Sequence, residues 1–188
     1  EEEFRVGDAV VGFARTRGPL VVCQSSLLFK MPTELSWTDA VHSMKHYSMA
    51  YLAIIEKAKL KAGDAVLCMN TDNPMCRAAQ QLAQAKGARV MVTRIDKEGD
   101  LNASSVDPLS LTFKDDVMSM TNGKGINIVV LPEESLVNEA VLGVLAIRAK
   151  ICFIGVKSAT SVDAPNARQM MINFSPYMNT TRGRERLR

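Results

Sequence analysis

The chain has 188 residues, of which 47% are hydrophobic and 23% are charged, and its formal net charge is +3. These proportions are those of an ordinary globular protein. A net charge this small does not supply the field that binding to nucleic acid or to a membrane surface needs, so we expect neither partner. No apolar run approaches the 18 residues of a membrane-spanning helix, and the acidic N-terminus is unlike a signal peptide.

The side chains that could bind a metal or form disulfides are few. The four cysteines are far apart in the sequence, and none forms a Cys-x-x-Cys pair: Cys23, Cys68, Cys76 and Cys152. This pattern predicts reduced thiols in a cytoplasmic protein. His42 and His46 have the spacing that places two imidazoles on one helix face, but no acidic motif accompanies them, so we expect no metal site.

Residues 1–35 have the signals of short β-strands. The Gly7-Asp8 turn is followed by an apolar run to Phe13, and further strands are predicted at 20–23 and 26–30. This length is too short for a complete β-domain, so we interpret residues 1–35 as the end of a β-rich domain.

Helices and strands alternate from residue 36 onward. Ser36 or Thr38 is placed to cap a helix that runs to about residue 59. Nearly continuous apolar strands are predicted at 65–69, 88–93, 126–131 and 150–155, with helices at 74–86, 113–121 and 133–146. The alternation predicts a doubly wound, parallel α/β sheet of the Rossmann type over residues 36–157, followed by a C-terminal segment at 158–188.

The loop after the first strand of that sheet is unusual for a dinucleotide-binding fold. There, glycines let a diphosphate approach the backbone N–H groups at the start of the next helix. This loop has no glycine, Pro74 removes one donor, and Asp72 adds a negative charge. We therefore treat the following residues as a degenerate cofactor loop and expect no cofactor: Thr71, Asp72, Asn73, Pro74 and Cys76. Arg77 could instead pair with a phosphate, although an exposed arginine is the simpler interpretation.

Five collinear stretches carry a resemblance to a known family: 4–13, 26–32, 59–67, 78–83 and 117–131. The chain resembles the enoyl reductase domain of polyketide and fatty acid synthases, particularly the highly reducing fungal type, within the medium-chain dehydrogenase/reductase superfamily. The segment Met120-Thr-Asn-Gly-Lys-Gly125, before an apolar strand, is the most specific of these stretches. The resemblance implies NADPH as the cofactor of active members, and it makes residues 1–35 the end of the substrate-binding subdomain.

The departures from the family pattern fall where chemistry is expected. The three glycines of the family loop correspond to Asn73, Pro74 and Cys76. Pro132-Glu133 stands where the family has Asn-Ser. The lysine proposed as proton donor in the family corresponds to Lys157, which is displaced by one position, and the chain is shorter than the family near Asp100, through either a deletion or an incomplete sequence.

These departures predict a non-catalytic, enoyl-reductase-like structural domain of a multidomain polyketide synthase. No catalytic residue is assigned beyond the displaced candidate Lys157, and whether the domain is an enzyme stays open. The expected partners are neighbouring domains of the synthase and a trans-acting enoyl reductase. Two alternatives remain: an active NADPH-dependent enoyl reductase with an atypical cofactor loop, and a stand-alone reductase-like protein with a binding or regulatory function.

Overall fold

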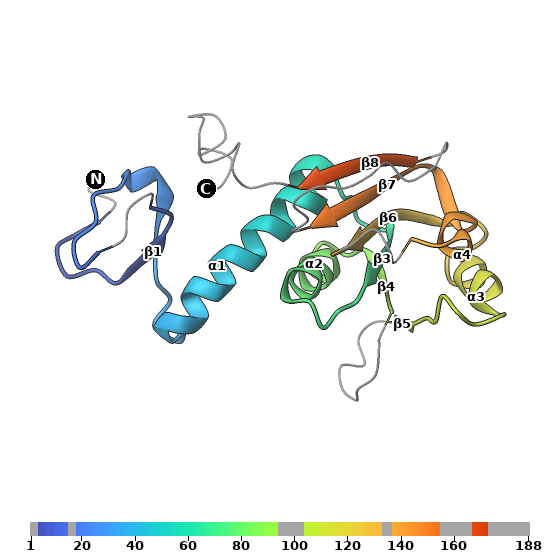
Figure 1. Ribbon diagram of the computed structural model, residues 1–188, viewed down its shortest axis with the longest axis horizontal. Helices are drawn as coiled ribbons and strands as arrows, with labels where there is room; N and C mark the ends of the chain where they lie inside the picture. The colour runs from blue at the N-terminus through green and yellow to red at the C-terminus, as the bar shows by residue number, and fades with distance from the viewer. Residues whose placement is uncertain (1–3, 15–17, 94–103, 133–136, 155–166, 173–188) are drawn as a thin grey trace. The chain divides into compact units, whose positions relative to one another are not determined.

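The computed structural model describes residues 4–14, 18–93, 104–132, 137–154 and 167–172, drawn as coloured ribbon in Figure 1. The chain divides into two compact units. The first comprises Glu1–Ser48 with Phe174–Arg188, and the second comprises Met49–Asn173.

The first unit contains a small antiparallel β-sheet. Strands β1 (Val10–Gly12) and β2 (Leu28–Lys30) pair from Val10 opposite Lys30 to Gly12 opposite Leu28, and the 3₁₀ turn η1 (Ser25–Leu27) precedes β2. A Cβ at Gly12 would lie 2.1 Å from the carbonyl oxygen of Leu27, so only glycine fits there. The strand predicted at 20–23 is wrong. Leu20 and Val22 are almost fully exposed and gain no strand partner within the described residues, and without one their β-propensity is not enough.

Helix α1 (Trp37–Tyr51) begins where the sequence predicts. The Ser36 hydroxyl accepts a hydrogen bond from the Asp39 N–H at 3.1 Å and donates one to the Asp39 carboxylate at 2.7 Å, which closes the N-terminus. The helix continues as a π-helical segment, η2 (Leu52–Lys57), whose residues Leu52, Ala53 and Ile54 are fully buried.

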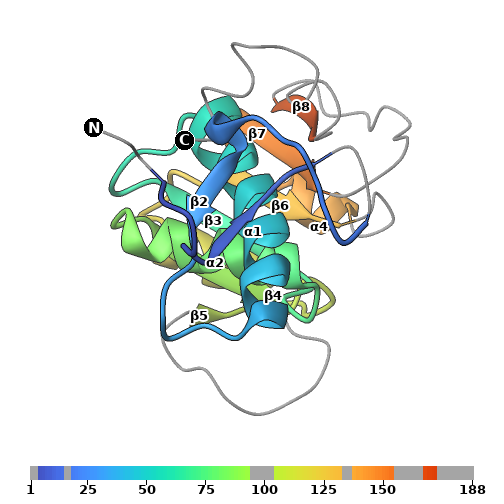
Figure 2. The same ribbon diagram turned by 90° about the vertical axis from the view of Figure 1, so that its left-hand side faces the viewer.

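The second unit is a six-stranded sheet in the order β5-β4-β3-β6-β7-β8, and every pairing in it is parallel. Its strands are β3 (Ala65–Met69), β4 (Arg89–Thr93), β5 (Ser104–Ser105), β6 (Ile126–Leu131), β7 (Leu145–Ile154) and β8 (Ala167–Ile172). Its helices are α2 (Pro74–Ala85), α3 (Phe113–Met120) and α4 (Glu139–Leu142). Successive strands add outward from β3 on one side and from β6 on the other, so the predicted doubly wound parallel sheet is confirmed. Figures 1 and 2 show β8 at one edge, beside β7.

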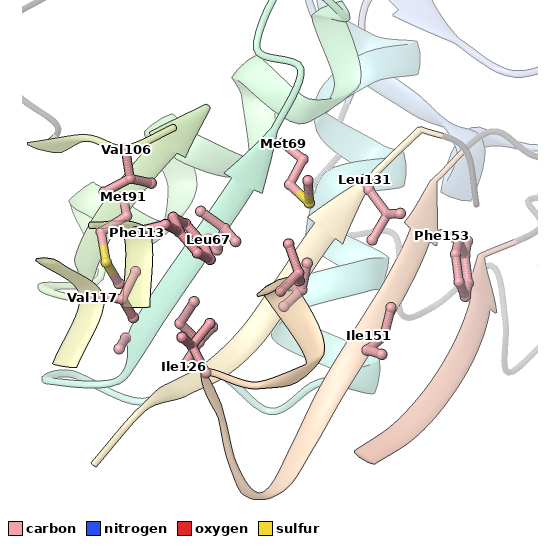
Figure 3. Close-up of a cluster of buried hydrophobic side chains, with 14 residues drawn as sticks. Leu67, Met69, Met91, Val106, Phe113, Val117, Ile126, Leu131, Ile151 and Phe153 are labelled. Atoms are coloured by element: carbon pink, nitrogen blue, oxygen red, sulfur yellow. The ribbon is translucent and has the colours of Figure 1, made fainter. Parts of the chain in front are cut away.

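Alternate residues of each strand point to opposite faces of the sheet, and helices cover both faces. On one face, Leu67, Ile151 and Phe153 pack in a cluster that includes Phe113 and Val117 of α3 (Figure 3). On the other face α2 contacts β3, β4 and β6, and η2 contacts β7 and β8. All five residues of β3 are buried, as expected for a central strand.

The C-terminal part of the sheet departs from the prediction. The helix predicted at 133–146 is wrong in extent, because α4 spans only Glu139–Leu142; residues 133–136 lie outside the described residues. Asn138 caps the start of α4, and the chain turns at Gly143 so that Leu145 can pair with Ile126 of β6. Sheet pairing therefore overrides the helical pattern of the sequence. Strand β8 lies in the segment 158–188, where no element was predicted.

Candidate functional site

The candidate site lies at the carboxyl ends of β3 and β6. The strand order reverses between these two neighbours, and ligands of open α/β sheets bind at such a reversal, outside the carboxyl ends of the strands. Met69 and Leu131 are the last residues of β3 and β6, as Figure 3 shows. The loop to α2 leaves from Met69, and the partly buried Pro132 follows Leu131. Two of the sequence departures, in the loop and at Pro132, therefore meet at this edge.

The start of α2 is closed by its own residues. Asn73 is the N-cap, and its side-chain carbonyl accepts a hydrogen bond from the Met75 N–H at 2.9 Å. Pro74 occupies the first helical position, where it has no N–H to offer. Of the first amides of α2, that of Pro74 is therefore absent and that of Met75 is already bonded to Asn73.

Arg77 is held against the same loop. Its Nε donates to the Thr71 carbonyl oxygen at 3.2 Å, and its guanidinium lies 3.9 Å from an Asp72 carboxylate oxygen. The Arg77 and Asp72 side chains are 58% and 64% exposed, so water screens this pair. A phosphate would therefore have to compete with the Asp72 carboxylate for the Arg77 guanidinium.

The backbone between β3 and α2 is tied to the adjacent strand. Asn70 adopts a left-handed conformation with φ 56°, and its N–H donates to the Thr93 hydroxyl at the end of β4, at 3.2 Å. The next residue, Thr71, is buried. This contact fixes the path of the loop as it leaves the sheet.

The cysteines belong to the core rather than to the site. Cys68 on β3 and Cys152 on β7 both lie opposite Val130 of the intervening β6, so they share the face that α2 covers. Cys76 is fully buried in α2, so it is a core residue and not the loop residue that the sequence predicts. Burial raises the pKa of the Cys76 thiol to about 12 and that of Cys152 to about 12, so neither is a nucleophile near neutral pH.

Lys157, Glu133 and Asp100 lie outside the described residues. The His42 and His46 rings stack with centroids 6.1 Å apart, but no group of three or more potential metal ligands occurs in the described part of the chain. Across the same ranges, no helix is long and apolar enough to cross a membrane.

The residues at the start of α2 do not fit the glycine cradle of a dinucleotide site. A cradle needs free N–H groups and an open backbone, whereas this helix offers a proline, a side-chain cap and a nearby carboxylate. This misfit concerns the place of a diphosphate at α2, and it follows from a loop without glycine.

No family model matches the chain. It is 30% identical over 146 residues to Pks1 of Mycobacterium tuberculosis, a type I polyketide synthase of phenolphthiocerol synthesis that is provisionally described as inactive. It is 33% identical over 147 residues to mycoketide-CoA synthase of the same species. Each match covers 74% of this chain but only 9% and 4% of the two relatives, so the similarity is to one segment of much longer polypeptides.

Solved structures share the fold. The CurK enoyl reductase superposes on 100% of this chain and 60% of its own length, with a TM-score of 0.75 and 17% sequence identity. An NAD-dependent alcohol dehydrogenase covers 81% of this chain and 49% of its own, with a TM-score of 0.64 and 24% identity.

The expectation that no cofactor belongs to this chain is wrong, because its structural neighbours are enoyl reductases and dehydrogenases, whose fold is built around a nicotinamide cofactor. The glycine-free loop changes the groups that a phosphate would contact at α2, but it does not change the class of the fold. The fungal subtype of the resemblance stays a prediction. The chain belongs to the type I polyketide synthases, of which it matches one segment, and its fold is that of enoyl reductases of known structure.

Proposed function

We propose that this chain is a non-catalytic, enoyl-reductase-like domain that serves a structural role inside a multidomain, cytoplasmic polyketide synthase. The observation that carries the proposal is the closed start of α2, where Asn73, Pro74 and the Asp72–Arg77 pair occupy the crevice edge. A nicotinamide dinucleotide is the cofactor class of this fold. On this proposal, its diphosphate would contact a loop that lacks the family's glycines.

A rebuilt loop is enough to stop the reaction without abolishing binding. A misplacement of about 1 Å far from the reacting atoms can cost on the order of a hundredfold in rate. The proline after β6 and the displaced Lys157 add further departures from the family at positions tied to chemistry.

The structural role is supported by an intact core. Large side chains in the core of the second unit, including Phe113, Leu67 and Ile151, are at most 1% exposed. The relatives are long synthases in which this region is one segment, so neighbouring domains are the proposed partners. A trans-acting enoyl reductase is a further proposed partner, which would supply the missing reduction.

One observation favours the second candidate, an active NADPH-dependent enoyl reductase with an atypical loop. Arg77 is more than half exposed at the first turn of α2 and could turn from Asp72 to a phosphate. The third candidate, a stand-alone binding protein, is separated from the others by the length of the native polypeptide.

The test is reduction of a crotonyl thioester by the intact protein, followed through NADPH oxidation. We expect no turnover above background, and we expect that deletion of residues 60–157 impairs assembly or product formation. Lys157→Ala should leave both unchanged, because on this proposal Lys157 takes no part in a reaction. If Lys157→Ala abolished reduction while the protein stayed folded and assembled, the active-enzyme candidate would replace the structural one.

A further inference from the structure

Asn73 is the N-cap residue that closes the start of α2. In this class of fold the N-terminal amides of the helix after the first strand meet the diphosphate of the dinucleotide. Here the Asn73 side-chain carbonyl already accepts the Met75 N–H at 2.9 Å, and Pro74 offers none. A phosphate arriving at α2 therefore has to displace the Asn73 carboxamide before it can bond to Met75.

We propose that Asn73 is a built-in competitor for the dinucleotide phosphate, so that its side chain lowers the affinity of the crevice for nicotinamide dinucleotides. This inference deepens the proposed function and rests on it for the identity of the ligand. In the free protein, the bond between the Met75 N–H and the Asn73 side chain stabilises the helix. Once the Asn73 side chain is removed, the Met75 N–H is able to donate to a phosphate. Asn73 is partly exposed, so a phosphate can reach it from solvent.

The second member of the closed loop reinforces this competition. Arg77 donates to the Thr71 carbonyl oxygen and lies beside Asp72, which holds the carboxylate near the start of α2. A carboxylate at that place repels a phosphate, while the asparagine withholds the amide. Asn73 is the better position to change, because glycine there removes the cap and leaves the backbone of α2 able to form.

The test compares substitutions that separate helix capping from phosphate binding. Asn73→Gly removes the competing side chain at little cost, since glycine is itself a tolerated N-cap and the melting temperature should fall by only about 1 °C. NADPH should bind about tenfold more tightly, the effect of one hydrogen bond between an amide and a charged phosphate. Asn73→Asp keeps the cap and adds a charge, so it should leave the melting temperature unchanged or higher while NADPH affinity falls about tenfold or more.

The matched control is Asn138→Gly. Asn138 caps α4 in the same way, accepting the Val141 N–H at 3.0 Å. Only two residues separate the end of helix α4 from the start of β7, so that end lies at the amino edge of the sheet, whereas the crevice lies at the carboxyl edge. This substitution should lower stability slightly and leave NADPH affinity unchanged.

Binding is measured by titration of the intact proteins with NADPH, alongside thermal unfolding without nucleotide. Affinities for Asn73→Gly and wild type that agree within twofold would overturn the competitor role, as would an equal gain in Asn138→Gly. Thioester reduction is assayed separately. Turnover by the wild-type protein would refute the proposed function and leave the Asn73 comparison intact, so the two failures are distinguishable.

Discussion

The interior of the six-stranded sheet and the loop that follows β3 use their residues in different ways. In the interior, β3 buries all five of its side chains between two layers of helices, as packing against both faces requires. In the loop and the first turn of α2, the Asn73 and Arg77 side chains bond to the chain's own backbone, at the Met75 N–H and at the Thr71 carbonyl oxygen. The fold depends on the buried residues of the strands, whereas the ligand-binding edge depends on the loop residues. The loop can therefore lose its glycines while the fold is kept.

The largest loss of stability is expected from a substitution in the interior of the sheet. Phe113 is 1% exposed within the cluster of Figure 3, so Phe113→Ala should lower the free energy of unfolding by about 3–5 kcal/mol through lost burial and a cavity. Denaturant unfolding measures this loss. Leu111→Ala is the matched control two residues earlier, because Leu111 is fully exposed and should change stability by less than about 0.5 kcal/mol. Equal losses in the two variants would mean that Phe113 does not lie in the core.

An intermediate effect sharpens the boundary between the two regions at Cys76. Burial raises the pKa of its thiol from 9.0 to about 12, so folding keeps the thiol protonated where the unfolded chain ionises. Its contribution is therefore complete below pH 9 and is lost as the pH rises from there towards 12. Between pH 8 and pH 10 the wild-type free energy of unfolding should fall by about 1 kcal/mol more than that of Cys76→Ala.

The measurement is denaturant unfolding of both proteins at the two pH values. Parallel losses would place Cys76 in the solvent-exposed loop, as its position in the sequence suggested, and would move the boundary of the core.

The smallest effect is expected in the loop itself. Arg77→Ala removes an exposed pair 3.9 Å apart and one bond to the Thr71 carbonyl, so unfolding should change by less than about 1 kcal/mol. Thermal unfolding at low and high salt measures the change, and Lys124→Ala in a turn remote from α2 serves as the control. A loss comparable to that of Phe113→Ala would show that the loop supports the fold, and the distinction between the two regions would fail.

Much of the second unit could be predicted because its signals are local. Continuous apolar runs indicated β3, β4 and β6, and a proline followed thirteen residues later by a glycine indicated α2, which spans Pro74–Ala85 with Gly87 at φ 74° beyond it. The predictions of secondary structure were wrong where strand partners that are far away in the sequence decide whether a segment forms a strand. Leu145 pairs with Ile126 and so extends β7 into a predicted helix, whereas Leu20 and Val22 gain no strand partner in the part of the chain that is described.

At the site, the sequence identified the unusual loop but could not assign the role of each side chain. The absence of glycine between Met69 and Arg77 is visible in the residues alone, because glycine's freedom belongs to the residue type. That Cys76 lies inside the core, that Asn73 caps Met75 and that Arg77 contacts Thr71 and Asp72 depend on the direction in which each side chain leaves α2. The sequence by itself determined the alternation of strands and helices, since hydrophobic period is local. Only the tertiary structure decided the strand order, which brings the ends of β3 and β6 together, because pairing between strands sixty residues apart depends on how the helices pack between them.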